Sequence, residues 1–239
     1  MRISNIRKSV KSAINQADNL SNKKGEKDYI IMIDVVIRNI ENKDLFEVEC
    51  VAKKAFWNLN MPGCDEHYTV HRLWNSEVCV PELSMLAERE GKIIGAILYA
   101  RAKIQTLNEE IETLTFGPLC VEPNMQKKGI GKQLLEKSME KARLLGFGSI
   151  FMCGVPTYYP KYGFKTADKF GITMSDGTNF DAFMGIELIK GSLNDISGKF
   201  YEPNVYCGDV HDEKYMIEVD GFDKDFPYME KMVLPHQWR

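Results

Sequence analysis

The sequence predicts an α/β fold with one large domain and an additional segment at each end. Strand-like and helix-like segments follow one another in the order β-α-α-β-β-β-α-β-α-β-β. The chain has 239 residues, of which 44% are hydrophobic and 27% are charged, so it can fill the core of a full-sized domain. One strand-like run also leads through a glycine-containing turn into an amphipathic run, and such a strand-to-helix connection belongs to an α/β fold.

The first 28 residues predict an amphipathic helix followed by a linker. Apolar residues recur at spacings of three and four, and the other face is basic. The apolar positions are Ile3, Ile6, Val10, Ala13, Ala17 and Leu20. Such a helix can dock on its own domain, form the seam of a homodimer or anchor weakly to an anionic membrane. We expect docking, because two alanines weaken a coiled-coil seam.

The next segments predict a strand and two helices. Tyr29–Arg38 is rich in isoleucine and valine, as strands are. Asn42 can cap a helix that extends to Phe56 with its apolar residues on one face. Pro62 and Gly63 break the chain, and Asp65–Asn75 predicts the second helix.

The rest of the domain predicts a hairpin, a helix and further strands. Ser84–Glu90 and Ile93–Arg101 flank a tight turn and predict an antiparallel hairpin. The segment Ile130–Leu145 has apolar residues near the 3.6-residue period and predicts a helix. The other predicted strands are Thr113–Val121, Ser149–Val155, Asp181–Leu188 and Lys199–Tyr206.

The turn between Val121 and Ile130 is the most informative part of the sequence. Gly129 and Gly131 let the backbone approach a ligand closely and direct several N–H groups into one concavity. The helix that follows adds its unpaired N–H groups and the positive end of its dipole. Such a turn binds phosphate oxygens. Three lysines around it, Lys127, Lys128 and Lys132, favour a phosphate-rich ligand.

Composition and residue spacing exclude several other classes. A net charge of −3 and a pI near 5.9 argue against nucleic acid as the main partner. The six cysteines have no metal-like spacing, and His67 and His71 lack further ligands, so we expect no metal site. The most apolar run, Tyr29–Ile37, is too short to span a bilayer, and the first 28 residues lack the apolar core of a signal peptide. These features predict a cytoplasmic protein.

Two ordered motifs resemble those of the GNAT superfamily of N-acetyltransferases. Gln126, Gly129 and Gly131 fill the fixed positions of a Q/R-x-x-G-x-G/A motif that follows a strand. Downstream, Tyr158–Phe164 is similar to the family's F/Y-Y-x-x-x-G-F segment. The resemblance covers roughly residues 34–206 and implies an N-acetyltransferase domain over residues 29–206. It also implies a mixed, mostly antiparallel central sheet with helices on both faces.

The resemblance implies acetyl-CoA as co-substrate, bound through backbone groups. The expected contacts are Leu119, Cys120, Val121, Gln126, Lys127, Lys128, Gly129, Ile130, Gly131 and Lys132. In such enzymes an amine attacks the thioester directly, and a tyrosine donates a proton to the leaving thiolate. The matching tyrosine is Tyr159, with Tyr158 and Tyr162 as competing hydroxyls. The general base stays unassigned. A water chain ending on Glu112 and an acceptor that arrives neutral are both open.

The resemblance leaves four acceptors open: a small-molecule amine, an antibiotic, a peptide N-terminus and a protein lysine. The resemblance implies that the acceptor pocket is formed by the loop over residues 57–71 and by the C-terminal strands. Residues 207–239 extend past the matched domain, and we expect their aromatic residues to pack on it. The preferred function is a CoA-dependent N-acetyltransferase. The alternative is a non-catalytic module that binds acyl-CoA or a partner protein.

Overall fold

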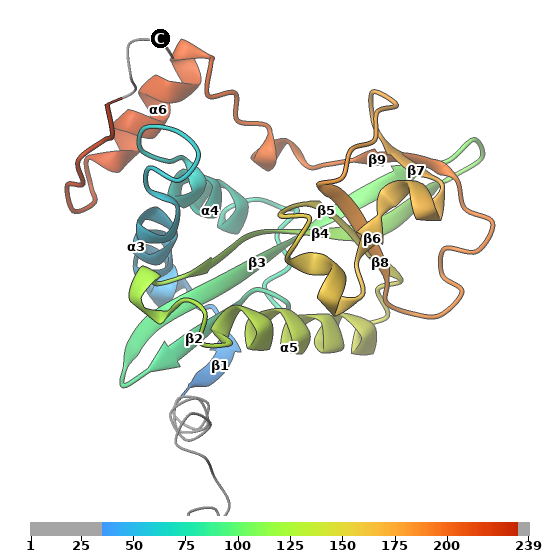
Figure 1. The fold of residues 1–239 in the computed structure, drawn as a ribbon, viewed down its shortest axis with the longest axis horizontal. Coiled ribbons are helices and arrows are strands. Elements are labelled where there is room, and N and C mark those ends of the chain that lie inside the picture. The colour runs from blue at the N-terminus through green and yellow to red at the C-terminus, as the bar shows by residue number, and fades with distance from the viewer. Residues whose placement is uncertain (1–34, 234–239) are drawn as a thin grey trace, which may run out of the picture. The chain divides into compact units, whose positions relative to one another are not determined.

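The computed structural model describes residues 35–233, and those from Val36 onward form one compact unit (Figure 1). The predicted N-terminal helix and linker lie outside the described residues. The same is true of the first six residues of the predicted strand Tyr29–Arg38.

A mixed sheet forms the centre of this unit. Within the described residues it has nine strands: β1 (Val36–Asn39), β2 (Met85–Arg89), β3 (Lys92–Gln105), β4 (Glu110–Val121), β5 (Ser149–Cys153), β6 (Lys165–Thr166), β7 (Ile172–Met174), β8 (Phe183–Glu187) and β9 (Gly198–Tyr201). The main order is β1-β2-β3-β4-β5-β8-β6, and β9 joins the far half of β3 to β7. Only β4–β5 and β7–β9 are parallel pairs among these strands.

Helices cover both faces of the sheet (Figure 1). On one face, α3 (Leu45–Phe56) and α4 (Glu66–Trp74) bury their apolar sides against β3 in a core that includes Leu98. The opposite face carries α5 (Ile130–Leu144), where the Tyr99 hydroxyl lies 3.0 Å from the Ser138 hydroxyl. Successive residues of β3 therefore point to opposite helical layers, as a strand requires. The expected mixed, mostly antiparallel sheet with helices on both faces is confirmed.

A second apolar core fills the far half of the sheet. It joins β3, β5, β8 and β9 to the short turns after β5. Its members include Ile104, Phe151, Phe183 and Phe200. Gly185 makes this packing possible, because a Cβ there would lie 2.4 Å from the Phe151 ring.

Several elements differ from the sequence prediction. Asn42 does not cap α3, because its side-chain oxygen accepts a hydrogen bond from the Trp74 indole. Near the start of that helix, the Asp44 carboxylate accepts a hydrogen bond from the Glu41 backbone N–H at 2.9 Å. The helix expected after β5 is replaced by two short 3-10 turns, Tyr159–Tyr162 and Ala167–Phe170. The last strand ends at Tyr201 rather than at residue 206. Pro203 then leads into another 3-10 turn, because proline cannot donate to a ladder.

The C-terminal segment contains a helix that the sequence analysis did not predict, α6 (Glu213–Asp223). It lies beside α3 and α4 in Figure 1. The buried Lys53 ammonium reaches Asp223 at 2.6 Å and donates to the Pro227 carbonyl at 2.9 Å. The Tyr215 hydroxyl donates to Asp65 at 2.7 Å. These contacts tie the C-terminal segment to the connection between α3 and α4.

Candidate functional site

The site is built where β4 and β5 diverge. The two strands are parallel and pair at one position only, Leu114 with Ile150. Beyond it β4 continues for seven residues, so its edge facing β5 is open within the described sheet. The Glu122 N–H donates to Ile94 on the β3 side at 2.9 Å. Because backbone direction alternates along a strand, Leu119 and Val121 present their peptide groups to the open edge.

The turn after β4 contains two glycines, and each position requires glycine for a different reason. Gly129 caps α5 with a φ of 84°, a left-handed conformation in which other residues are strained. Gly131 lies in the first turn of α5, where an added Cβ would lie 3.1 Å from the Tyr158 hydroxyl. The first N–H groups of α5 have no carbonyl partner inside the helix and point toward the turn. This arrangement is typical of an anion-binding site.

A cavity of about 720 Å³ adjoins this turn and the open edge of β4. Eight of the ten residues that the resemblance implied for cofactor binding line it: Leu119, Val121, Gln126, Lys127, Gly129, Ile130, Gly131 and Lys132. Cys120 and Lys128 do not. The Cys120 side chain is buried in the α3–α4 core and its backbone faces β3, while the Lys128 ammonium donates to the Asn124 carbonyl.

Aromatic residues form the opposite wall of the cavity. Tyr159, Tyr158 and Tyr162 all line it, together with Val155 and Lys161. Lys161 was not predicted, because it lies between two motif positions. Its ammonium is 4.1 Å from the Tyr158 ring centre and adds a third cation to those of Lys127 and Lys132.

The tyrosines occupy distinct places. Tyr158 lies at the start of α5, as its distance to Gly131 shows, and its oxygen accepts a hydrogen bond from Tyr162 at 3.4 Å. Tyr159 lies deeper: its ring packs 5.7 Å from the Phe116 ring of β4 and is only 9% exposed. Its hydroxyl makes no hydrogen bond within residues 35–233. Burial raises the pKa of Tyr159 to about 12, so the phenol is neutral at physiological pH.

On the α3–α4 side, the C-terminal segment engages much of the loop expected to hold the acceptor. Trp57 donates to the Glu230 carbonyl, Tyr68 donates to Glu218, and the buried His67 lies 3.1 Å from Asp223. Burial lowers the pKa of His67 to about 4, so it is neutral near pH 7. Glu66 instead lines a cavity of about 220 Å³, and burial raises its pKa to about 7.

Glu112, considered above as the end of a proton path, is ion-paired. Its carboxylate contacts the Arg101 guanidinium, and both side chains are about half exposed. The two threonines in the first half of β4 are also hydrogen-bonded or buried. Thr113 bonds to Ser149, and Thr115 is buried.

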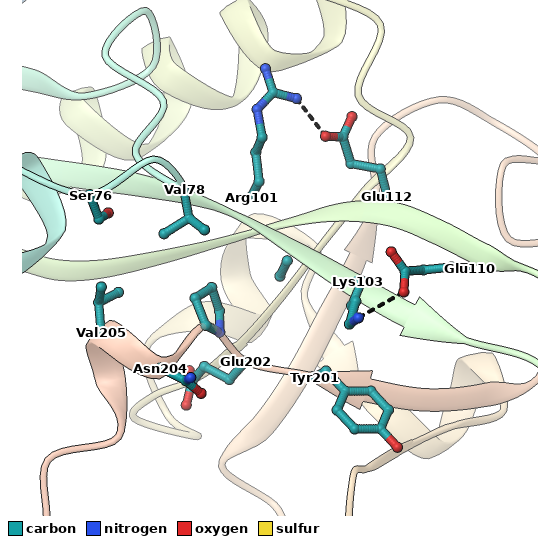
Figure 2. Close-up of a pocket in the computed structure, with 12 residues that line it drawn as sticks. Ser76, Val78, Arg101, Lys103, Glu110, Glu112, Tyr201, Glu202, Asn204 and Val205 are labelled. Carbon is teal, nitrogen blue, oxygen red and sulfur yellow. Dashed lines mark hydrogen bonds and ion pairs between the residues drawn. The ribbon is translucent and has the colours of Figure 1, made fainter.

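A second cavity, of about 700 Å³, lies along the far half of β3 and β4 (Figure 2). Two ion pairs, Arg101–Glu112 and Lys103–Glu110, lie on its β3–β4 side. Glu202 comes from the segment that follows β9. We call this cavity the β3–β9 groove.

Two negative observations complete the description. Residues 35–233 contain no group of three or more histidine, cysteine, aspartate or glutamate side chains that could hold a metal ion. Every helix in the same range is too short or too polar to cross a bilayer.

Comparisons with known proteins identify a related domain family. Residues 80–166 match the family model of the acetyltransferase (GNAT) domain. The uncharacterized N-acetyltransferase YjhQ of Escherichia coli (strain K12) is 38% identical over 96 residues. That alignment covers 40% of this chain and 53% of YjhQ, so the chain matches about half of that relative's length.

Two solved structures have a similar fold. The GNAT family N-acetyltransferase YhbS from Escherichia coli, in complex with CoA, has a TM-score of 0.65 and 18% identity, covering 73% of this chain and 92% of that one. A GNAT family acetyltransferase from Brucella melitensis, in complex with acetyl-CoA, has a TM-score of 0.59 and 22% identity, covering 72% and 97%. Residues 80–166 thus match the acetyltransferase (GNAT) domain, and the described unit has the fold of solved GNAT family N-acetyltransferases.

Proposed function

We propose that this protein transfers an acetyl group from acetyl-CoA to a primary amine, by direct attack while both substrates are bound. The observation that carries the proposal is the cavity of about 720 Å³ at the divergence of β4 and β5. It joins an anion-binding turn to an open strand edge and a buried tyrosine. The CoA and acetyl-CoA bound to the two structural relatives support the choice of cofactor.

Each part of acetyl-CoA has a matching part of the cavity. The pyrophosphate fits the N–H groups of the turn over residues 126–132, with Lys127, Lys132 and Lys161 supplying positive charge. The pantetheine arm carries amides, which can pair with an open strand edge as an added strand does. Leu119 and Val121 supply the backbone groups for this pairing. Cys120 does not, because its peptide faces β3.

The reaction needs a hydrogen-bond donor that stabilises the tetrahedral oxyanion and a proton for the departing CoA thiolate. The amine nitrogen attacks the carbonyl carbon, a C–N bond forms, and the C–S bond breaks. A backbone N–H at Leu119 or Val121 stabilises the oxyanion, and such donors each contribute a large factor in rate. The neutral phenol of Tyr159 donates a proton to the thiolate. Tyr158 is the weaker candidate for this role, since it lies at the phosphate end of the cavity.

The test is release of free CoA thiol, followed spectrophotometrically, with the full chain, acetyl-CoA and a panel of primary amines. The panel contains an alkylamine, a polyamine and a peptide with a free N-terminus. Release that requires both the protein and an amine is the expected result. Tight binding of acetyl-CoA without release on any amine would contradict catalysis and would favour a non-catalytic acyl-CoA-binding module.

We also infer a cytoplasmic location. All six cysteines lie within the described residues and are free thiols. Free thiols are typical of proteins in a reducing compartment, because secreted proteins pair them.

A further inference from the structure

Most charges along the β3–β9 groove are balanced. Arg101 and Lys103 supply two positive charges, and Glu110 and Glu112 supply two negative ones as their ion-pair partners. Glu202 adds a third carboxylate with no cation beside it (Figure 2). The groove therefore has one excess negative charge, which favours a cationic ligand such as an ammonium group.

Glu202 is unusual because it is half-buried and has no partner. It makes no hydrogen bond and no ion pair within residues 35–233. Burial alone raises the pKa of its carboxyl group. Enclosing a carboxylate without a compensating donor costs free energy, so such a group is uncommon unless it has a function.

The position of Glu202 relates it to the candidate active site. It follows Tyr201, the β9 residue that pairs with Lys103 of β3. Burial, and to a smaller extent the charge of Glu202, raises the pKa of the Cys153 thiol, at the end of β5, and of the Tyr206 phenol. The Tyr206 hydroxyl donates at 3.0 Å to the carbonyl of Gly117 on β4. Glu202 therefore lies near both strands where they diverge, and Cys153 precedes Val155 of the cofactor cavity by two residues.

We infer that Glu202 is the proton acceptor for the amine, which reaches the thioester along the β3–β9 groove. This inference rests on the proposed acetyl transfer. It adds the general base, the path by which the amine enters and the chemical class of that amine. The substrate is a primary amine that is protonated in solution, such as an alkylamine.

The protons of the reaction balance with this assignment. The ammonium gives one proton to the Glu202 carboxylate, and the neutral nitrogen attacks the acetyl carbon. After the C–N bond has formed, the nitrogen loses a second proton to solvent, and Tyr159 gives one to the departing thiolate. The phenolate is then reprotonated by solvent. The products are the amide, which keeps one N–H, the CoA thiol and one proton released from Glu202.

Glu66 is the competing carboxylate, because burial and, as smaller causes, the charges of Glu122 and Glu66 raise the pKa of the Cys120 thiol on β4. Its surroundings differ from those of Glu202. Glu66 begins α4, and its carboxylate is stabilised locally by backbone N–H groups and by the Cys64 thiol. Burial outweighs these donors and raises the pKa of Glu66 to about 7, but Glu66 lines the cavity of about 220 Å³ and not the β3–β9 groove.

The experiment measures the single-turnover rate of acetyl transfer against pH for the alkylamine that reacts fastest with the wild type. Glu202→Gln is expected to lower the rate at neutral pH by about 10²–10⁴-fold, with the Kd for acetyl-CoA unchanged. The loss should shrink as the pH approaches the pKa of the amine, because solvent then supplies the neutral form. Glu202→Asp should restore part of the rate.

The matched control is Glu110→Gln, which removes one carboxylate from the same groove. It should alter KM at most. Glu66→Gln tests the competing residue. A neutral-pH rate for Glu202→Gln within a few-fold of the wild type, a loss that is equal at every pH, or a pH-dependent loss in Glu66→Gln instead would each overturn the assignment. If the wild type releases no thiol with any amine, the proposed function fails together with it.

A melting experiment gives a readout independent of activity. Because burial raises the pKa of Glu202 in the folded protein, its charged form destabilises the fold increasingly as pH rises through that pKa. Glu202→Gln removes this cost. Its melting temperature should exceed that of the wild type by more at about pH 8 than at about pH 5. A variant that is less stable at both pH values would show a structural role and contradict the inference.

Discussion

Tyr159 combines burial with access to the cofactor cavity. Its ring is fixed between Phe116 and Phe164, while its hydroxyl has no hydrogen-bond partner in the described part of the chain. Gly154 is part of this fit, because a Cβ there would lie 2.4 Å from the Tyr159 ring. A phenol with a pKa of about 12 stays protonated at neutral pH, so it can donate to the sulfur as negative charge develops there in the transition state.

Tyr159→Phe is expected to lower the single-turnover rate of acetyl transfer by about 10²–10⁴-fold at neutral pH. The change removes one oxygen and keeps the ring contacts, so affinity for acetyl-CoA should stay nearly unchanged. Rapid-quench kinetics gives the rate, and calorimetric titration gives the affinity.

Tyr162→Phe and Tyr158→Phe are the controls for the Tyr159 assignment. Tyr162→Phe should leave the chemical step near the wild-type rate. Tyr158→Phe should act mainly on cofactor affinity, because the Tyr158 hydroxyl lies at the start of α5. Wild-type chemistry in Tyr159→Phe, with the loss in Tyr158→Phe, would assign the proton to the other hydroxyl.

Some residues of the site could be predicted from local sequence signals. Others can be recognised only from their position in the folded chain. Gly129 and Gly131 are predictable because a turn that exposes backbone N–H groups needs glycine at fixed spacing. Lys161 and Glu202 carry no such signal. Glu202 becomes notable only when β9 pairs with β3 and brings the end of the strand close to β4 and β5.

Among the elements, α6 depends most on long-range contacts. Only Tyr215 and Val219 of this helix are buried, and Ile217 is 64% exposed. Its apolar pattern is therefore weak, which explains why the sequence analysis did not predict it. Ion pairs and hydrogen bonds to α3 and α4 hold it instead. The long amphipathic segments α3 and α5 were predicted because their apolar periodicity is strong.

Asp223→Ala is expected to reduce the free energy of unfolding by about 3–5 kcal/mol, since it leaves the ammonium of Lys53 buried without its counter-charge. Lys53 is 2% exposed. Urea denaturation followed by circular dichroism measures the change.

The matched control for Asp223→Ala is Asp220→Ala, which breaks the exposed pair with Lys231 and should cost at most about 1 kcal/mol. Lys53→Met combined with Asp223→Leu should recover much of the stability, because the buried charge is then gone. Equal effects of Asp223→Ala and Asp220→Ala would show that the Lys53 contact does not stabilise the docked helix.

For the whole described unit, the divergence of β4 and β5 connects the two faces of the sheet. It adjoins the turn and the tyrosines of the cofactor cavity, and the Tyr206 hydroxyl bonds to the Gly117 carbonyl just beyond the single β4–β5 pairing. The order of the main elements follows from local periodicity. The short strands β6 and β7 do not, since pairing with distant strands defines them.

Hydrogen–deuterium exchange with and without acetyl-CoA tests the central claim, that the cavity at the β4–β5 divergence binds the cofactor. Acetyl-CoA should slow exchange at residues 119–132 and 155–162 in the wild type. A variant with valine at both Gly129 and Gly131 should lose this protection while staying folded. Protection confined to the β3–β9 groove, or equal protection in the valine variant, would contradict the account.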